Sequence, residues 1–177
     1  MTIQEQTTTT TLRVDALPVA ELDRIRAAGM DDFGNPVRTF VNADEGGTPL
    51  RCCLSEAAVG EKMALLAWQP APPTSAYAEV GPVFVHADQC PGYTETGAYP
   101  EKFRHRQQLL RAYDQHGTAI NNQVAEGAHV EDVLHELFTR PEVDYVHSRN
   151  PLAGCYMFQI TRAAQPTTLQ MPGTPAK

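Results

Sequence analysis

No stretch of this 177-residue sequence approaches the roughly 18 consecutive apolar residues that a membrane-spanning helix requires. The segment 1–11 is polar and rich in threonine, and it has neither the basic start nor the apolar centre of a secretory signal. We therefore expect a cytoplasmic protein that does not insert into membranes.

Positive charge is also scarce. Lys and Arg number 14 against 21 Asp and Glu, which gives a formal net charge of −7. Proteins that bind nucleic acids usually carry a basic patch or stripe, but here the only compact basic run is 102–106, which we interpret as an exposed face that forms salt bridges. No nucleic-acid partner is expected, while a small-molecule ligand and a homodimer stay open.

Cysteine occurs only four times. A chain of this length in a reducing compartment needs no disulfide framework, so the thiols serve as core residues, metal ligands or reactive groups. The phosphate-binding GxxxxGK[ST] loop, the zinc-protease HExxH motif and the hydrolase GxSxG motif are all missing. Those three chemistries are disfavoured, no cofactor is predicted, and the sequence does not decide whether the protein is an enzyme.

Hydrophobic residues make up 42% of the chain, which is typical of a globular domain. Segments 1–10 and 163–177 lack apolar periodicity and are predicted to be disordered tails around a single domain at 11–162. Periodicity predicts strands at 11–17, 38–41, 62–69, 81–87, 109–114, 118–124, 143–149 and 155–162, and helices at 19–28 and 128–140. A helix over 101–113 competes with the strand at 109–114.

These elements lack regular alternation of strand and helix. We therefore predict an α+β fold: a single compact domain with an antiparallel or mixed sheet of about five to seven strands flanked by helices.

Several short motifs, taken in order, resemble the bacterial family known as "domain of unknown function 1203". The resemblance covers roughly 11–162 and gives the domain its boundaries, but the family name carries no activity. Its motifs are Pro49-Leu50-Arg51-Cys52-Cys53-Leu54, Gly60-Glu61, Gly81-Pro82-Val83-Phe84-Val85-His86-Ala87 with Cys90, Leu110-Arg111-Ala112-Tyr113-Asp114, His147-Ser148-Arg149, Gly154-Cys155 and Arg162.

The first motif departs from the family pattern, which often reads Pro-Cys-Arg-x-Cys-Leu. Leu50 stands at its first cysteine, and Cys53 matches its second. If this segment is extended, side-chain alternation sends Cys52 and Cys53 to opposite faces, one buried and one exposed. Cys52 would then be unable to replace the missing cysteine, and a redox role for the pair stays open.

His86 and Cys90 are the first candidates for chemistry. His86 ends a predicted strand, and a turn after it could return the Cys90 sulfur towards the imidazole. Such a pair can generate a thiolate nucleophile or supply two ligands to one metal ion. The simpler interpretation is a core thiol and a histidine whose hydrogen bonds fix the loop.

A second group of candidates lies on the strands near the C-terminus. His147 and Arg149 share a strand face, and Arg111 with Tyr113 could complete an anion-binding pocket beside them. The alternatives are that Arg149 pairs with a carboxylate and that Tyr113 packs on a guanidinium plane. Cys155 begins the next strand and is a further candidate nucleophile.

One arrangement would unite the two groups. His86, Cys90, His147 and Cys155 are residue types that suit tetrahedral zinc, although their spacing matches no recognised zinc motif. We do not predict a metal site on this basis.

Three functions follow from the sequence. The first is a protein that binds a small anionic ligand, with or without catalysis, in a polar His/Arg/Cys pocket at one end of the sheet. The second is a thiol-dependent enzyme or redox protein that uses Cys90 or Cys155. The third is a non-catalytic structural or interaction protein.

Overall fold

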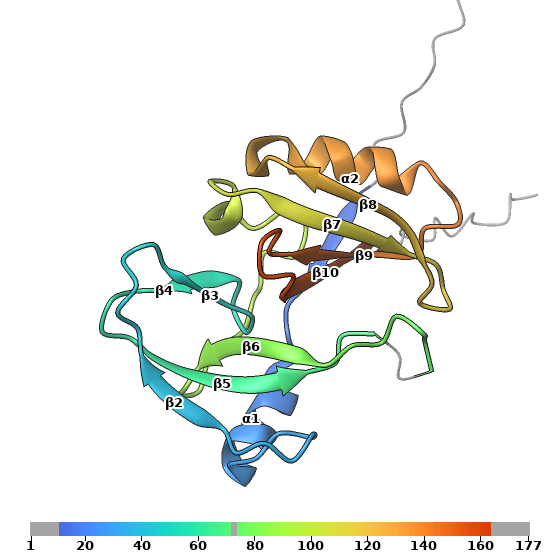
Figure 1. Ribbon diagram of the computed structural model, residues 1–177. Coiled ribbons are helices and arrows are strands. Elements are labelled where there is room, and N and C mark those ends of the chain that lie inside the picture. The colour runs from blue at the N-terminus through green and yellow to red at the C-terminus, as the bar shows by residue number, and fades with distance from the viewer. Residues whose placement is uncertain (1–10, 72–73, 164–177) are drawn as a thin grey trace, which may run out of the picture.

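The computed structural model describes residues 11–71 and 74–163 (Figure 1). The tails predicted at 1–10 and 163–177 lie outside this range except for Ala163, whose amide donates to the Thr11 carbonyl at 2.8 Å. None of the helices in the described residues is long and apolar enough to cross a membrane.

The larger sheet has five strands, all antiparallel, in the order β1-β10-β9-β7-β8. The helix α2 covers one face of this sheet (Figure 1). In chain order the elements are β1 (Leu12–Asp15), β7 (Gln108–Tyr113), β8 (Ala119–Ala125), α2 (Val130–Phe138), β9 (Tyr145–Arg149) and β10 (Tyr156–Arg162).

A second, three-stranded antiparallel sheet has the order β2-β5-β6, and a separate hairpin joins β3 to β4. The elements are α1 (Val19–Ala28), β2 (Arg38–Val41), β3 (Thr48–Leu50), β4 (Ser55–Ala57), β5 (Lys62–Trp68) and β6 (Gly81–His86). The described part of the chain also contains two 3-10 turns, η1 (Glu101–Phe103) and η2 (Gly127–His129).

Local sequence explains both helices. Pro18 precedes the first residue of α1 in extended backbone, and Gly29 ends the helix at a φ of 67° that glycine adopts without strain. In α2, Leu134, Leu137 and Phe138 lie on one buried stripe, as the apolar spacing predicts. Both predicted helices are confirmed.

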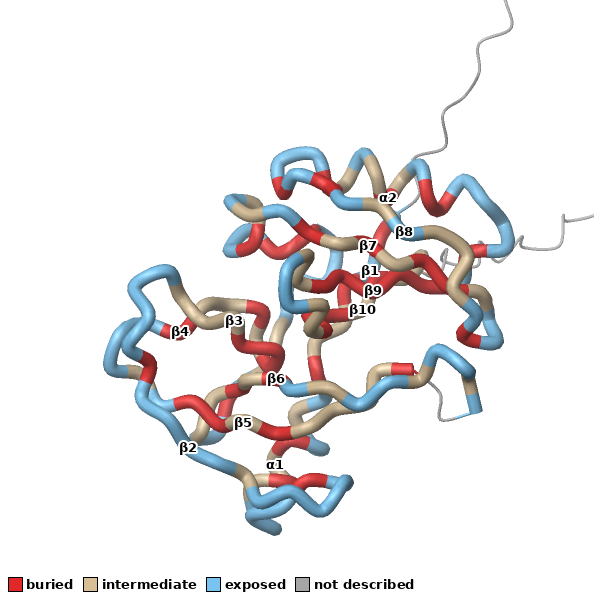
Figure 2. The backbone as a smooth tube through the Cα atoms, in the orientation of Figure 1, coloured by how far each residue is buried: buried red, intermediate tan, exposed pale blue. Residues whose placement is uncertain are grey.

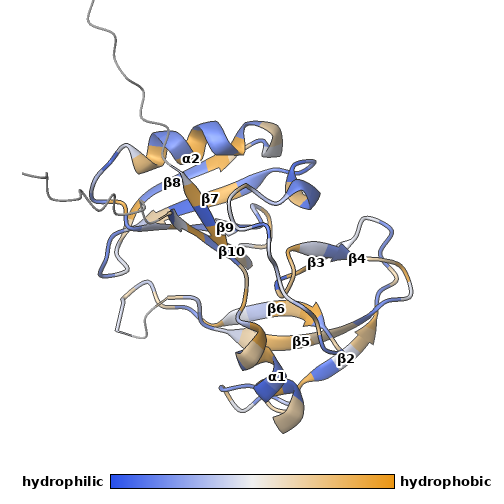
Figure 3. Cartoon of the chain, turned by 180° about the vertical axis from the view of Figure 1, so that it is seen from behind, coloured by the Kyte–Doolittle hydropathy of each residue, from blue (hydrophilic) through white to orange (hydrophobic). Residues whose placement is uncertain are grey.

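The apolar residues form two clusters rather than one. One lies between α2 and the five-stranded sheet and contains Phe103, Leu110 and Phe158. The other lies between α1, the β3-β4 hairpin and the three-stranded sheet, and it contains Leu22, Val85 and Cys52. In Figure 2 buried segments lie in both the five-stranded and the three-stranded sheet, and in Figure 3 β5 is largely hydrophobic. The candidate site described below borders the second cluster.

The prediction of an antiparallel sheet with two helices is confirmed, and one sheet has five strands, but the other five strands form two further sheets that were not predicted. The strands divide among sheets of five, three and two. The strands β3 and β4 were not predicted, because three residues each are too few to show alternation. The competing helix over 101–113 is also wrong, since only 101–103 form a helical turn and β7 follows.

Candidate metal centre

The β3-β4 hairpin carries two cysteines at its tip. The chain turns at residues 51–54, where the Leu54 amide donates to the Leu50 carbonyl at 3.0 Å and Leu54 takes a left-handed φ of 54°. Because the segment is a tight turn and not an extended strand, the expectation of opposed thiols is wrong. The Sγ atoms of Cys52 and Cys53 lie 4.0 Å apart.

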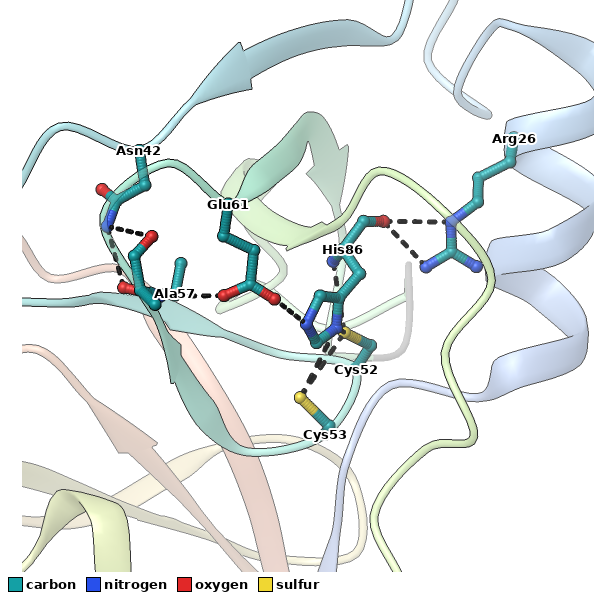
Figure 4. Close-up of polar contacts among 8 residues, drawn as sticks. Arg26, Asn42, Cys52, Cys53, Ala57, Glu61 and His86 are labelled. Carbon is teal, nitrogen blue, oxygen red and sulfur yellow. Dashed lines mark hydrogen bonds and ion pairs between the residues drawn. The ribbon is translucent and has the colours of Figure 1, made fainter.

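The end of β6 meets this turn. The Arg51 amide donates to the Phe84 carbonyl at 2.9 Å, which brings the hairpin tip beside His86, the last residue of β6. Arg26 of α1 clamps the same strand end, since its Nε and Nη2 donate to the His86 carbonyl at 3.1 and 3.0 Å (Figure 4). Cys90 follows in the loop after β6 and is buried.

Four ligand atoms converge where these segments meet. The Sγ atoms of Cys52, Cys53 and Cys90 and a ring nitrogen of His86 all lie within 4.8 Å of one another. His86 Nδ1 is 3.2 Å from Cys52 Sγ and 3.7 Å from Cys53 Sγ (Figure 4). Ligands around a tetrahedral zinc ion lie roughly 3.5–3.8 Å apart, as follows from Zn–S and Zn–N bonds of about 2.3 and 2.0 Å. Movements of about an ångström would therefore close this cluster on a metal ion.

Glu61 fixes the orientation of the imidazole. Its Oε1 lies 2.7 Å from His86 Nε2, and its Oε2 accepts the Ala58 amide at 2.8 Å. Because an ionised carboxylate only accepts hydrogen bonds, Nε2 carries the proton, and Nδ1 faces the sulfurs. Asn42 holds the turn that presents Glu61: its side chain donates to the Ala57 carbonyl at 2.8 Å (Figure 4).

Polar contacts around the sulfurs favour a thiolate at Cys52. A hydrogen bond from the Cys53 thiol lowers the pKa of Cys52 most, and the His86 amide, which donates to Cys52 Sγ at 3.3 Å, lowers it further. The same contact with Cys52, together with burial, raises the pKa of Cys53. Burial raises the pKa of Cys90, although the Gly92 amide opposes this. The His86 amide directed at the Cys52 sulfur compensates the negative charge of a thiolate there.

Gly92 is required for the path of the Cys90 loop. It has a φ of 87°, and a Cβ atom there would lie 2.7 Å from Val19 Cγ2 of α1. We expect Gly92→Ala to lower the free energy of unfolding by about 2–4 kcal/mol, the sum of left-handed strain and steric overlap. Gly34→Ala is the matched control, since its φ is 81° and no atom lies within 4 Å. Its cost should be about 1–2 kcal/mol, from the strain alone. Urea unfolding of both variants measures the difference, and equal costs would contradict the predicted overlap.

The structure brings His86 and Cys90 together, as the sequence allowed, but Cys52 and Cys53 complete their cluster. His147 is fully buried in β9, where burial and the nearby Arg149 charge lower its pKa to about 3. Its ring packs against those of Tyr113, Tyr145 and Tyr156. Cys155, Arg111 and Arg149 line a different pocket.

Sequence reasoning missed the approach of Cys52 and Cys53 to His86 and Cys90, and the contact between Glu61 and His86. A signal was present, because Cys52-Cys53, Gly60-Glu61 and His86 with Cys90 all belong to motifs of the resemblance. What was lacking was the hairpin turn, which no periodicity reveals in segments of three residues.

Comparison with known proteins bears on the same segment of the chain. A family model described as "Protein of unknown function (DUF1203)" matches residues 47–162, a range that includes the four clustered residues and Glu61. No curated protein and no solved structure matches the chain. The match covers more than half of the sequence and confirms the resemblance over that range. The chain therefore belongs to the DUF1203 family.

Proposed function

We propose that Cys52, Cys53, His86 and Cys90 bind one zinc ion. The supporting observation is the convergence of three sulfurs and one imidazole nitrogen within 4.8 Å. Three thiolates and one imidazole are a ligand set of tetrahedral zinc sites, and thiolate ligands select against calcium and magnesium. The contact of His86 Nε2 with Glu61 supports the assignment, because histidine ligands generally donate their second ring N–H to a carboxylate or carbonyl.

The role of this ion is structural. Four protein ligands fill a tetrahedral shell and leave no position for a substrate or a water molecule. The ligands come from the β3-β4 turn, the end of β6 and the loop after it, so the ion would join three segments that few backbone hydrogen bonds connect. On this proposal the protein is a metal-stabilised domain.

Titration with Co²⁺ tests the coordination directly. Tetrahedral cobalt with thiolate ligands shows sulfur-to-metal charge-transfer absorption and strong visible bands, whereas octahedral cobalt with oxygen ligands shows only weak ones. We expect the tetrahedral spectrum at one equivalent of Co²⁺ and its loss when Zn²⁺ is added. A weak octahedral spectrum at saturation would refute a thiolate-rich site.

Glu61 provides a graded test of the same site. We expect Glu61→Gln to weaken Zn²⁺ binding by roughly 10- to 100-fold, because an outer carboxylate orients the ligand and raises its basicity. Glu45→Gln is the control, an exposed carboxylate in the loop before β3. Competition with a chromophoric chelator measures both affinities. Equal affinities for the two variants would remove Glu61 from the site.

Thiol chemistry is the second candidate function, favoured by the lowered pKa of Cys52. The burial of that residue argues against it, because Cys52 has an exposed fraction of 0%. Alkylation of the metal-free protein by iodoacetamide separates the two functions. A fast-reacting Cys52 supports a nucleophile, and a slow one supports a ligand role.

A further inference from the structure

A pocket of about 240 Å³ lies between the five-stranded and the three-stranded sheet, and none of the four clustered residues lines it. Strands β7 and β9 supply Arg111 and Arg149, β10 supplies Tyr156, and Trp68 ends β5 on the opposite wall. Glu79 and Cys155 also line it. The pocket therefore combines two guanidinium groups with aromatic and apolar walls.

Arg149 is the unusual member of this set. Its side chain is only 3% exposed, and its Nη1 donates to the Gly154 carbonyl at 3.0 Å. Its Nε forms no hydrogen bond within the part of the chain that the structure describes. A buried guanidinium with an unused donor is costly unless an anion satisfies it.

Glu79 partly fills this need. Its Oε1 lies 2.5 Å from Arg149 Nη2 and 3.2 Å from Arg111 Nη1, so one carboxylate oxygen bridges the two arginines. This contact agrees with the simpler interpretation of Arg149 as an ion-pair partner. Two arginines against one carboxylate nevertheless leave one positive charge uncompensated in the lining.

Another anion can easily replace the Glu79 carboxylate on the two arginines. The Glu79 side chain is 48% exposed, whereas that of Arg149 is nearly inaccessible. An exposed carboxylate regains its hydration when it leaves, so the exchange costs little as long as an incoming anion takes its place on Arg149. An incoming carboxylate that also covers the aromatic wall would gain apolar contact that Glu79 does not make.

We propose that this pocket binds a small organic carboxylate, whose oxygen atoms replace those of Glu79 on Arg149 and Arg111. The planar guanidinium fork matches carboxylate geometry. The volume limits the ligand to a small molecule, since pockets for drug-sized ligands usually begin at about 300 Å³. Its apolar part would lie against Trp68 and Tyr156.

Chemical rescue of a variant that lacks the Glu79 carboxylate tests the proposed site. In Glu79→Ala, sodium propionate supplies the carboxylate that the substitution deletes, and propionamide is the neutral control of the same shape. At ten times its Kd, propionate should raise the Tm of this variant by roughly 3 °C or more. The wild type should respond less at the same concentration, because Glu79 competes. Sodium chloride keeps the ionic strength equal throughout.

A double variant identifies the binding groups. In Glu79→Ala/Arg111→Gln the shift produced by propionate should fall to that produced by propionamide. Glu79→Gln, which keeps the side-chain volume, replaces Glu79→Ala if the latter does not fold. Equal shifts with propionate and propionamide in the single variant, or an undiminished propionate shift in the double variant, would overturn the proposal. Neither result depends on zinc, because none of the four clustered residues lines this pocket.

Discussion

Substitution of Cys90 by serine is expected to weaken Zn²⁺ binding by roughly a hundredfold. Structural zinc sites bind with about 10–16 kcal/mol, so the loss of one of four ligands removes roughly 3 kcal/mol, and each 1.4 kcal/mol is about a factor of ten. Serine keeps the size of the side chain but supplies a poor zinc ligand at neutral pH. Competition with a chromophoric chelator measures the affinity.

Cys155→Ser is the matched control for this experiment. Cys155 is partly exposed, lines the pocket that contains Arg111 and Arg149, and is no member of the cluster. Its loss should leave the zinc affinity within about twofold of the wild type, a difference of roughly 0.4 kcal/mol. A Cys90→Ser variant that binds zinc as tightly as Cys155→Ser would show that Cys90 is only a buried core thiol.

Removal of zinc is expected to lower the thermal stability of the domain strongly. A ligand at a thousand times its Kd stabilises the folded state by about 4 kcal/mol, and each kcal/mol moves the Tm of a domain of this size by about 2–4 °C. Dialysis against a chelator should therefore lower the Tm by roughly 8–16 °C, and added Zn²⁺ should restore it. Differential scanning calorimetry measures both steps.

The Cys90→Ser variant separates this effect from damage by the chelator itself. Its Tm should lie near that of the metal-free wild type and should change little on chelation. If the wild type and the variant lose the same number of degrees in chelator, the loss does not come from zinc at this cluster.

The sequence predicts well those elements in which the apolar pattern extends over many residues. Hydrophobic spacing predicts α2 and the apolar runs of β5 and β6, and Gly29 marks the end of α1. The division into three sheets was not predictable in this way, because it depends on which edges pair across long loops. β6, for example, pairs with β5 and not with the five-stranded sheet.

The candidate site was predictable only in part, for a related reason. His86 and Cys90 are four residues apart, so a single turn suffices to join them. Cys52 and Cys53 approach His86 from more than thirty positions away, through the hydrogen bond between the Arg51 amide and the Phe84 carbonyl. Alternation in an extended strand gave the wrong orientation for the two thiols, because the positive φ of Leu54 turns the chain instead.

Native mass spectrometry tests the central claim most directly. The protein is purified without chelator, and its native mass is compared with its denatured mass. We predict a mass excess of one zinc ion per chain in the wild type and in Cys155→Ser, and its loss in Cys90→Ser. A wild-type protein that carries no zinc, even after incubation with Zn²⁺, would contradict the account.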